Sequence, residues 1–303
     1  MTGATGQHGS TGAHVVASLR EQGVPVRVLA RTSSERTASL EALGAEVVYG
    51  DFRDRRSLEP AFADVTDATF TYPVAAGIVE AAANFAAAAR TVATPPRVFV
   101  MSMAPSHPQS PSPLGRAHWL AEEVFGWAGL APSVLRVAAF FYENVTLFHA
   151  ATIRERGVIA NSFGDAALPW IAGIDAARLL VRAILDPSLF PPGVHLPPGA
   201  ELATHATLAE RLSSQLGRDV GYESISHDDW KRELLERARR NDSAVNISMA
   251  DHITALSGIF AGGKPPMTKP DPTQLATLLG GPVTNFTEFV EAHRPSLSLA
   301  SSR

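Results

Sequence analysis

The chain has 303 residues, of which 45% are hydrophobic, and its formal net charge is -4. This size and composition fit one large α/β domain or a domain with a substantial appendage, and the mild acidity gives no electrostatic reason to expect a nucleic-acid partner. Cysteine is absent, so disulfides, thiolate catalysis and zinc–thiolate sites are excluded. No apolar run reaches the roughly 18 residues that a membrane span needs, and the N-terminus lacks a signal-peptide pattern. We therefore expect a cytoplasmic protein with no membrane partner.

A glycine-rich turn opens the chain. It consists of Gly3, Ala4, Thr5, Gly6, Gln7, His8 and Gly9, and the next segment is expected to form a helix over 10–20. Absent side chains let the backbone approach phosphate groups, and the N–H groups at a helix N-terminus favour negative charge. We therefore predict that Gly3, Thr5, Gly6, Gln7, His8 and Gly9 bind the pyrophosphate of a dinucleotide. The alternative is a mobile N-terminal arm.

The strand that should precede this turn is very short. A glycine turn of this kind normally follows a buried parallel strand of about five residues, but only Met1 and Thr2 precede Gly3. Either the start of the chain is missing or the central strand is a stub. A stub is expected to leave hydrogen-bonding groups of both neighbouring strands unpaired.

Strand-like and helix-like segments alternate up to about residue 144. Alternation at this spacing predicts βαβ units with right-handed crossovers, and therefore a Rossmann-type doubly wound parallel sheet of the α/β class. Strands are expected at 24–30, 45–49, 68–71, 97–101 and 133–139, and helices at 39–43, 57–62, 78–92 and 114–127.

The pattern loosens in the second half. A strand at 168–174 and helices at 175–185, 207–216, 228–239 and 286–292 are expected, with irregular segments at 187–198 and 262–272 and a frayed tail from 295. We therefore expect a dinucleotide-binding domain over 1–150, to which 168–186 returns. Residues 151–303 should form a smaller α+β part that binds substrate at the carboxyl edge of the sheet.

The end of the second expected strand indicates which dinucleotide binds. An acidic residue there favours NAD, whereas an arginine accommodates the 2'-phosphate of NADP. Arg31 occupies this position, followed by Thr32 and Ser33, so NADP(H) is predicted in preference to NAD(H). The alternative is a solvated arginine. Asp51 and Phe52 follow the third strand, where they could reach the adenine, or serve as a turn residue and a core aromatic.

These motifs together resemble a known family. The chain is similar to the NmrA-like branch of the atypical short-chain dehydrogenase/reductases. The resemblance is carried by the glycine turn, Arg31, Gly50-Asp51-Phe52, Ser102, His118 with Glu122, Leu135-Arg136 and the run Phe141-Tyr142-Glu143-Asn144. It implies an NADPH-dependent reductase of quinones, enones or ketones, or a redox-sensing regulator that binds the dinucleotide without turnover.

The chain lacks the Tyr-x-x-x-Lys pair of the main superfamily branch, because its lysines are Lys231, Lys264 and Lys269. By resemblance, His118 stands at the lysine position and Leu114 at the tyrosine position. The catalytic candidates are Tyr142, His118 and Ser102, and Ser102 and His118 are also candidates for cofactor contact. The alternatives are a pocket wall for Tyr142 and a structural hydrogen bond for His118. Tyr72 and Pro73 are expected to wall the nicotinamide pocket, and Arg136 and Glu143 to form structural hydrogen bonds.

An apolar substrate pocket is expected from aromatic residues, although each could equally be core. Its candidates are Phe140, Phe141, Tyr142, Asn144 and Trp170, with Phe148 and Phe163. The histidines are scattered, so no metal site is expected. Quinone reduction needs no strong general acid, because the product anion is stabilised by its own ring. We therefore predict an NADPH-dependent oxidoreductase, acting as a monomer or homodimer on a small apolar or aromatic substrate, including a specialised-metabolite intermediate. The alternatives are a non-catalytic NADP(H) sensor and a non-redox isomerase or cyclase.

Overall fold

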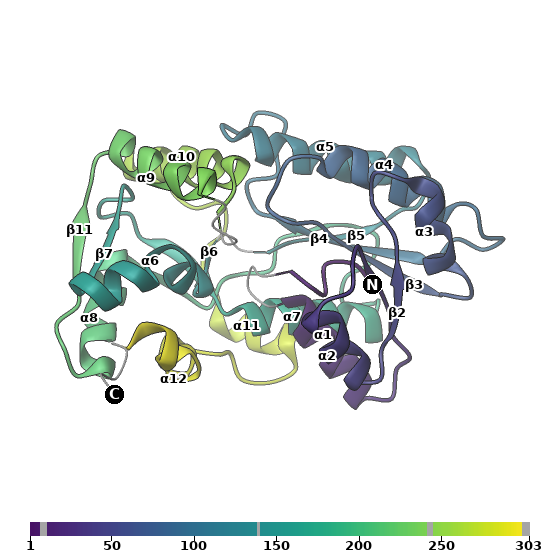
Figure 1. Ribbon diagram of the computed structural model, residues 1–303, viewed down its shortest axis with the longest axis horizontal. Helices are drawn as coiled ribbons and strands as arrows, with labels where there is room; N and C mark the ends of the chain where they lie inside the picture. Colours follow the sequence, from purple (N-terminus) through teal and green to yellow (C-terminus); the bar gives the residue numbers. More distant parts are fainter. Residues whose placement is uncertain (7–10, 138–139, 241–244, 299–303) are drawn as a thin grey trace.

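The computed structural model describes residues 1–6, 11–137, 140–240 and 245–298. The predictions for Gln7, His8 and Gly9 lie outside these residues. Two parts of the chain are visible in Figure 1, a larger one around a parallel sheet and a smaller one that contains most of the second half.

The larger part is built on parallel strands. β1 (Arg27–Ala30) pairs with β2 (Glu46–Tyr49), while β3 (Asp67–Thr71), β4 (Arg97–Met103), β5 (Ser133–Val137) and β9 (Gly193–His195) follow one another in a second ladder. β3, β4 and β5 are largely buried, because helices cover both faces of the sheet. The predicted parallel sheet is confirmed.

Met1 and Thr2 connect the two ladders. The amide of Leu29 in β1 donates to the carbonyl of Met1 at 2.9 Å, and the amide of Thr2 donates to the carbonyl of Thr69 in β3 at 3.3 Å. Oγ1 of Thr2 accepts from the amide of Thr71 at 2.8 Å. The expectation that the short strand leaves these neighbouring groups unpaired is therefore wrong. The strand order is β2, β1, Met1–Thr2, β3, β4, β5 and β9.

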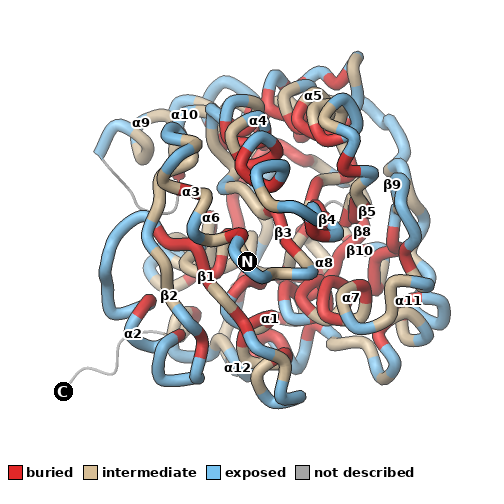
Figure 2. The backbone as a smooth tube through the Cα atoms, turned by 90° about the vertical axis from the view of Figure 1, so that its right-hand side faces the viewer, coloured by how far each residue is buried: buried red, intermediate tan, exposed pale blue. Residues whose placement is uncertain are grey.

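Helices cover both faces of this sheet (Figure 1). One face carries α1 (Thr11–Glu21), α7 (Gly173–Leu185) and α11 (Pro272–Leu279), and the other carries α3 (Arg55–Phe62), α4 (Ile78–Ala89) and α5 (Pro113–Trp127). The short α2 (Glu35–Ala42) lies beside β2. Figure 2 shows buried residues in the strands and on the inner sides of the helices. This doubly wound arrangement confirms the Rossmann-type prediction.

The smaller part has its own core. A three-stranded sheet contains β6 (Phe140–Phe141), β8 (Leu168–Ile171) and β10 (Glu201–Ala203), and β7 (Val158–Asn161) pairs with β11 (Gly221–Ser224). The surrounding helices are α6 (Glu143–Arg156), α8 (His205–Leu216), α9 (His227–Arg239), α10 (Ile247–Ala261) and α12 (Phe286–Leu297). Between β8 and β10 the chain returns to the larger part, where α7 packs against α1.

Two segments that were expected to be irregular or frayed have regular structure instead. β9 lies inside the proline-rich segment that was expected to be irregular, because its three residues pair with the edge strand β5. α12 continues through Pro295 to Leu297, where fraying was expected. Leu297 is buried, and Arg218 donates to its carbonyl at 3.1 Å. In the part of the chain that the structure describes, no helix is long and apolar enough to cross a membrane.

Candidate functional site

The glycine turn packs directly on the end of β3. Gly3 has a φ of +75°, and a Cβ atom there would come within 2.8 Å of Cβ of Thr71. The amide of Gly6 donates to the carbonyl of Gly3 at 3.1 Å, which closes the turn. Only glycine fits position 3 without strain or a clash. The backbone of the turn therefore lies at the carboxyl edge of the sheet, where ligands of this fold bind.

A fourth glycine, which our sequence analysis did not assign to the site, brings α1 against the turn. A Cβ atom on Gly12 would lie 2.4 Å from the carbonyl oxygen of Gly3 and 2.6 Å from Cα of Ala4. The sequence carries the signal, because Gly12 continues the three-residue spacing of Gly3, Gly6 and Gly9. The helix can approach the turn this closely only without a side chain at this position.

Arg31 follows β1, at the position where a residue that binds the 2'-phosphate was expected. It is exposed and precedes α2, whose N-terminus is capped by Ser34. The guanidinium of Arg36 donates to the carbonyl of Thr5 at 2.9 Å, so α2 also contacts the glycine turn. A guanidinium beside a helix N-terminus favours an anionic ligand.

Asp51 and Phe52 lie near Arg31 but already have protein partners. Arg53 donates to Oδ2 of Asp51 at 2.7 Å, and the hydrogen bonds from Arg53 lower the pKa of Asp51 to about 2, with a smaller contribution from the charge of Arg31. Nδ2 of Asn84 donates to the carbonyl of Phe52 at 2.6 Å. The two residues are thus fixed on the Arg31 side of the sheet.

Tyr72 lies beside this group. Its ring is 5.7 Å from the ring of Phe52, and its hydroxyl donates to the carbonyl of Ala76 at 3.1 Å. Burial is the main cause that raises the pKa of Tyr72. Pro73 follows as an exposed residue. The geometry groups Tyr72 with Phe52 and Asp51, the residues expected at the adenine end.

Ser102 and Arg136 meet at a buried carboxylate. The hydroxyl of Ser102 donates to Glu122, and Ser106 donates to Oε1 of the same side chain at 2.7 Å. Arg136 donates to Oε2 of Glu122 at 2.5 Å, with 14% of its own side chain exposed. The structural hydrogen bond expected for Arg136 is present. The Ser102 hydroxyl is directed to Glu122 in this arrangement.

His118 lies one helical turn before Glu122. Because Glu122 faces Ser102 near the end of β4, the preceding turn of α5 extends past the end of that strand. Among the described residues, Nε2 of His118 has no hydrogen-bond partner, although the side chain is buried. Burial, followed by the charge of the neighbouring His252 of α10, lowers the pKa of His118 to about 3. A buried imidazole nitrogen without a partner leaves a position for a ligand atom.

Tyr142 is held inside the smaller part. Its hydroxyl donates to Oε1 of Glu201 at 2.5 Å, and its ring stacks on that of Trp170 with centroids 6.1 Å apart. Burial, followed by the carboxylate of Glu201, raises the pKa of Tyr142 far above its ordinary value. In this geometry the proton of the hydroxyl is already committed to a protein group.

Several predicted substrate residues line one internal cavity. Of the predicted set, it contains Phe140, Asn144, Phe148, Phe163 and Trp170. It also contains His149, His205, Trp230 and Ile253, which the sequence analysis missed. Phe141 packs against the core of the larger part instead, because neighbouring residues of a strand face opposite sides. No sequence signal distinguished His149 or His205 from the other scattered histidines.

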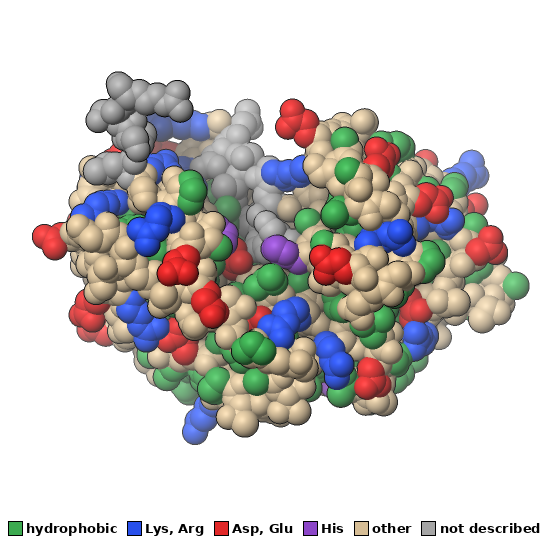
Figure 3. All heavy atoms as spheres, turned by 90° about the horizontal axis from the view of Figure 1, so that it is seen from below, with side chains coloured by type: hydrophobic (Ala, Val, Ile, Leu, Met, Phe, Trp, Pro, Cys, Tyr) green, Lys and Arg blue, Asp and Glu red, His purple; other side chains and the backbone are tan. Residues whose placement is uncertain are grey.

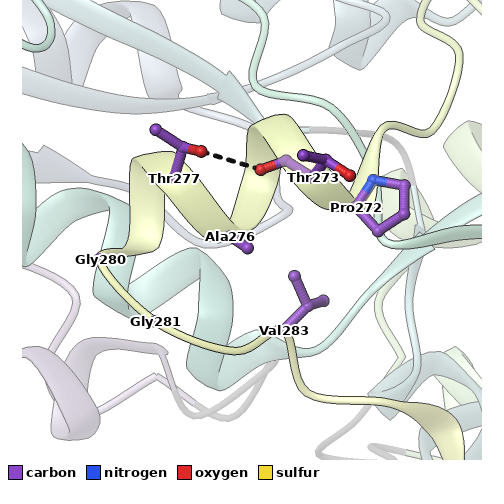
Figure 4. Close-up of a pocket in the computed structure, with 7 residues that line it drawn as sticks. All are labelled: Pro272, Thr273, Ala276, Thr277, Gly280, Gly281 and Val283. Carbon is purple, nitrogen blue, oxygen red and sulfur yellow. Dashed lines mark hydrogen bonds between the residues drawn. The ribbon is translucent and has the colours of Figure 1, made fainter.

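A larger hollow lies on α11 and carries no predicted residue. Figure 4 shows its lining, which comes from one segment, 272–283, and its volume is ≈ 680 Å³. The hydroxyl of Thr277 donates to the carbonyl of Thr273 at 3.0 Å within that segment. The hollow is open to solvent and has no titratable side chain, so we do not assign it a role in the site.

The surface gives a further indication about partners. On the face shown in Figure 3, Lys and Arg side chains are interspersed with Asp and Glu. A nucleic-acid site usually requires a basic patch or stripe. The mixed charge of this face does not provide one.

Glu143 links the start of α6 to α7. Both of its carboxylate oxygens accept from the amide of Gly173 at 3.0 Å. Oγ1 of Thr11 in α1 donates to the carbonyl of the same glycine at 3.5 Å. Burial raises the pKa of Glu143 to about 7. The structural hydrogen bond expected for Glu143 is present, and it ties the smaller part to the start of α7, which Thr11 in turn links to α1.

The fold and the glycine turn define a protein of the Rossmann-type dinucleotide-binding class. The family model of the NmrA-like family matches residues 1–269, and the chain therefore belongs to this family. The predicted resemblance is confirmed.

Individual relatives span nearly the whole chain. It is 28% identical to the NAD(P)H azoreductase of Xenophilus azovorans, over 97% of this chain and 98% of that protein. The crystal structure of the NADPH-dependent quinone oxidoreductase 2 of Escherichia coli, complexed with NADPH, superposes with a TM-score of 0.78 at 23% identity, covering 96% of this chain and 98% of that one. NmrA, a negative transcriptional regulator in complex with NADP, gives a TM-score of 0.73 at 15% identity, covering 97% and 94%.

The raised pKa of Glu143 predicts a pH dependence of stability. Because the pKa rises from 4.5 to about 7 on folding, the folded protein binds more protons than the unfolded chain between these values. The stabilisation is complete below pH 4.5 and is lost as the pH rises through about 7. Between about pH 5 and about pH 8, the free energy of unfolding of the wild type should fall more than that of Glu143→Gln, by at most about 3 kcal/mol. Urea unfolding of both proteins measures this difference, and parallel pH profiles would contradict the assignment.

Proposed function

We propose that this protein is an NADPH-dependent reductase that transfers a hydride to a small aromatic or apolar acceptor such as a quinone, enone or ketone. The observation that carries the proposal is the glycine turn, held at the carboxyl edge of the sheet with Arg31 beside it. Relatives named as an azoreductase and a quinone oxidoreductase support it. A specialised-metabolite intermediate belongs to the same substrate class.

The residues present fit such a cofactor. Because Gly3 packs on Thr71 and Gly12 lets α1 approach the turn, the backbone next to the N-terminus of α1 fits a pyrophosphate. Arg31 would hold the 2'-phosphate, Phe52 the adenine end and the unpartnered Nε2 of His118 a ribose hydroxyl. Tyr72, whose ring lies beside that of Phe52, is reassigned from the nicotinamide pocket to the adenine end. When bound, NADPH supplies the hydride.

The candidate side chains near the site are poor proton donors, and this limits which acceptors the protein could reduce. The Ser102 hydroxyl is directed to Glu122 and the Tyr142 hydroxyl to Glu201. The low pKa of His118 keeps its imidazole neutral near pH 7, so it holds a hydrogen bond rather than supplying a proton. We therefore favour an acceptor whose reduced anion is stabilised by its own ring and takes its proton from water. Trp170 and Phe140 line the small aromatic cavity beside which this ring is proposed to lie.

A non-catalytic NADP(H) sensor is the second candidate. The committed hydroxyls of Ser102 and Tyr142 favour it, and so does the similarity in fold to a transcriptional regulator crystallised with NADP. A sensor needs the cofactor site but no acceptor site. The two candidates therefore differ in turnover and not in dinucleotide binding.

Turnover separates the two candidates. The purified chain should oxidise NADPH in the presence of menadione, an enone or an azo dye, at a rate that rises with acceptor concentration and saturates. The absorbance of NADPH measures this directly, and heat-denatured protein is the control. Binding of NADPH without oxidation by any acceptor would reject the reductase and support the sensor.

The preference for NADPH should depend on Arg31. Because a guanidinium–phosphate pair is a charge-assisted hydrogen bond, Arg31→Ala should weaken NADPH binding roughly tenfold or more, while NADH binding changes little. Calorimetric titration measures both affinities. Arg90→Ala, which changes an exposed arginine at the end of α4, is the matched control. Equal losses for NADPH and NADH would place the phosphate elsewhere.

A further inference from the structure

His205 is an unusual member of the aromatic cavity. It begins α8 after the capping residue Thr204, and only 4% of it is exposed. Its ring stacks on Phe163 with centroids 5.0 Å apart and meets Trp170 edge-on at 5.3 Å. A polar ring is therefore enclosed by aromatic side chains.

The second histidine of the cavity has a partner. Nδ2 of Asn161 donates to Nε2 of His149 at 3.3 Å. Oδ1 of Asn161 in turn accepts from the hydroxyl of Tyr222 at 3.0 Å and from the amide of Phe163 at 3.1 Å. This network fixes the ring of His149 and leaves it little freedom to bind a ligand.

Nδ1 of His205, in contrast, has no hydrogen-bond partner among the described residues. Burial lowers the pKa of His205 to about 3, so the ring is neutral near pH 7 and has one donor and one acceptor nitrogen. A buried polar atom without a partner costs roughly 1–3 kcal/mol. A ligand atom that satisfies Nδ1 would recover much of this free energy.

The space inside the cavity limits what can reach this atom. The cavity has a volume of only ≈ 10 Å³. That is about the space of one water molecule. The partner of Nδ1 is therefore a single small atom at the tip of a ligand rather than a whole ring.

We propose that Nδ1 of His205 binds an oxygen or nitrogen atom carried by the planar ring of the substrate, and that this atom fills the water-sized space in the cavity. The proposal rests on the reductase function proposed above. The ring itself would stay outside this space, at the side of the cavity that Asn144 lines, because Asn144 is half-buried whereas the other lining residues are buried. His205 would thus select ring substrates that carry a hydroxyl, carbonyl or azo group over plain hydrocarbons. It is a specificity-determining residue of the acceptor site.

Two probes that differ by one hydroxyl group test this selection. The whole chain without cofactor is titrated with p-cresol and with toluene, and binding is followed by NMR. The wild type should bind p-cresol roughly tenfold more tightly, because toluene leaves Nδ1 unpaired. His205→Phe should reduce this preference to less than about twofold. His205→Asn, which keeps a hydrogen-bonding group, should retain part of it.

His227→Phe is the matched control, since His227 also begins a helix after a capping residue but is exposed. It should keep the full preference. Any of three results would overturn the proposal. The wild type could bind both probes equally, it could bind neither, or His205→Phe could keep the full preference for p-cresol over toluene.

A measurement on the wild type decides the question if His205→Phe does not fold. In ¹⁵N spectra, p-cresol should shift the imidazole signals of His205, identified by their loss in His205→Asn, whereas toluene should not. The absence of such a shift would overturn the proposal. Since neither experiment requires NADPH or turnover, their outcome is distinguishable from failure of the reductase function.

Discussion

Hydrogen bonds at Thr2 hold the centre of the main sheet together. Its amide donates to the carbonyl of Thr69, and its Oγ1 accepts from the amide of Thr71, while Met1 pairs with β1 on the other side. These bonds set the place where the chain turns at Gly3, because a Cβ atom there would contact Thr71. Three features depend on this pairing of Met1 and Thr2 with their neighbouring strands. They are the glycine turn, the close approach of α1 through Gly12 and the position of Arg31 relative to both.

The two parts of the molecule offer different chemistry. The larger part presents backbone amides, a helix N-terminus and arginine at the carboxyl edge of the sheet, which suit an anionic ligand. The smaller part encloses aromatic rings with a few polar atoms, which suits a flat apolar ligand. Glu143 connects them through Gly173, the first residue of α7. Most polar groups near the strand ends are paired with one another, and the buried nitrogens of His118 and His205 are left without partners in the described chain.

The sequence was most informative where the decisive contacts are local. Alternating segments predicted the parallel sheet, and the glycine spacing placed the turn before α1. Partners far apart in the sequence could not be predicted in this way. The hydroxyl of Tyr142 meets Glu201 59 positions later, and Ser102 meets Glu122 through the packing of α5 on β4. The aromatic run after β5 was recognised, but strand alternation directs Phe141 away from the cavity, and the distant His205 enters it from α8. Arg53 could have been found as a partner of Asp51, since it lies only two residues further on.

The most direct test of this account is a calorimetric titration with NADPH of the wild type and of Thr2→Val. Valine has nearly the same shape as threonine but lacks the hydroxyl, so the amide of Thr71 loses its partner and the turn loses its anchor. We predict that the wild type binds about one NADPH per chain, and that Thr2→Val binds it at least roughly tenfold more weakly while its circular dichroism stays that of a folded protein. The account would be contradicted if Thr2→Val bound NADPH as tightly as the wild type does. It would also be contradicted if neither protein bound NADPH.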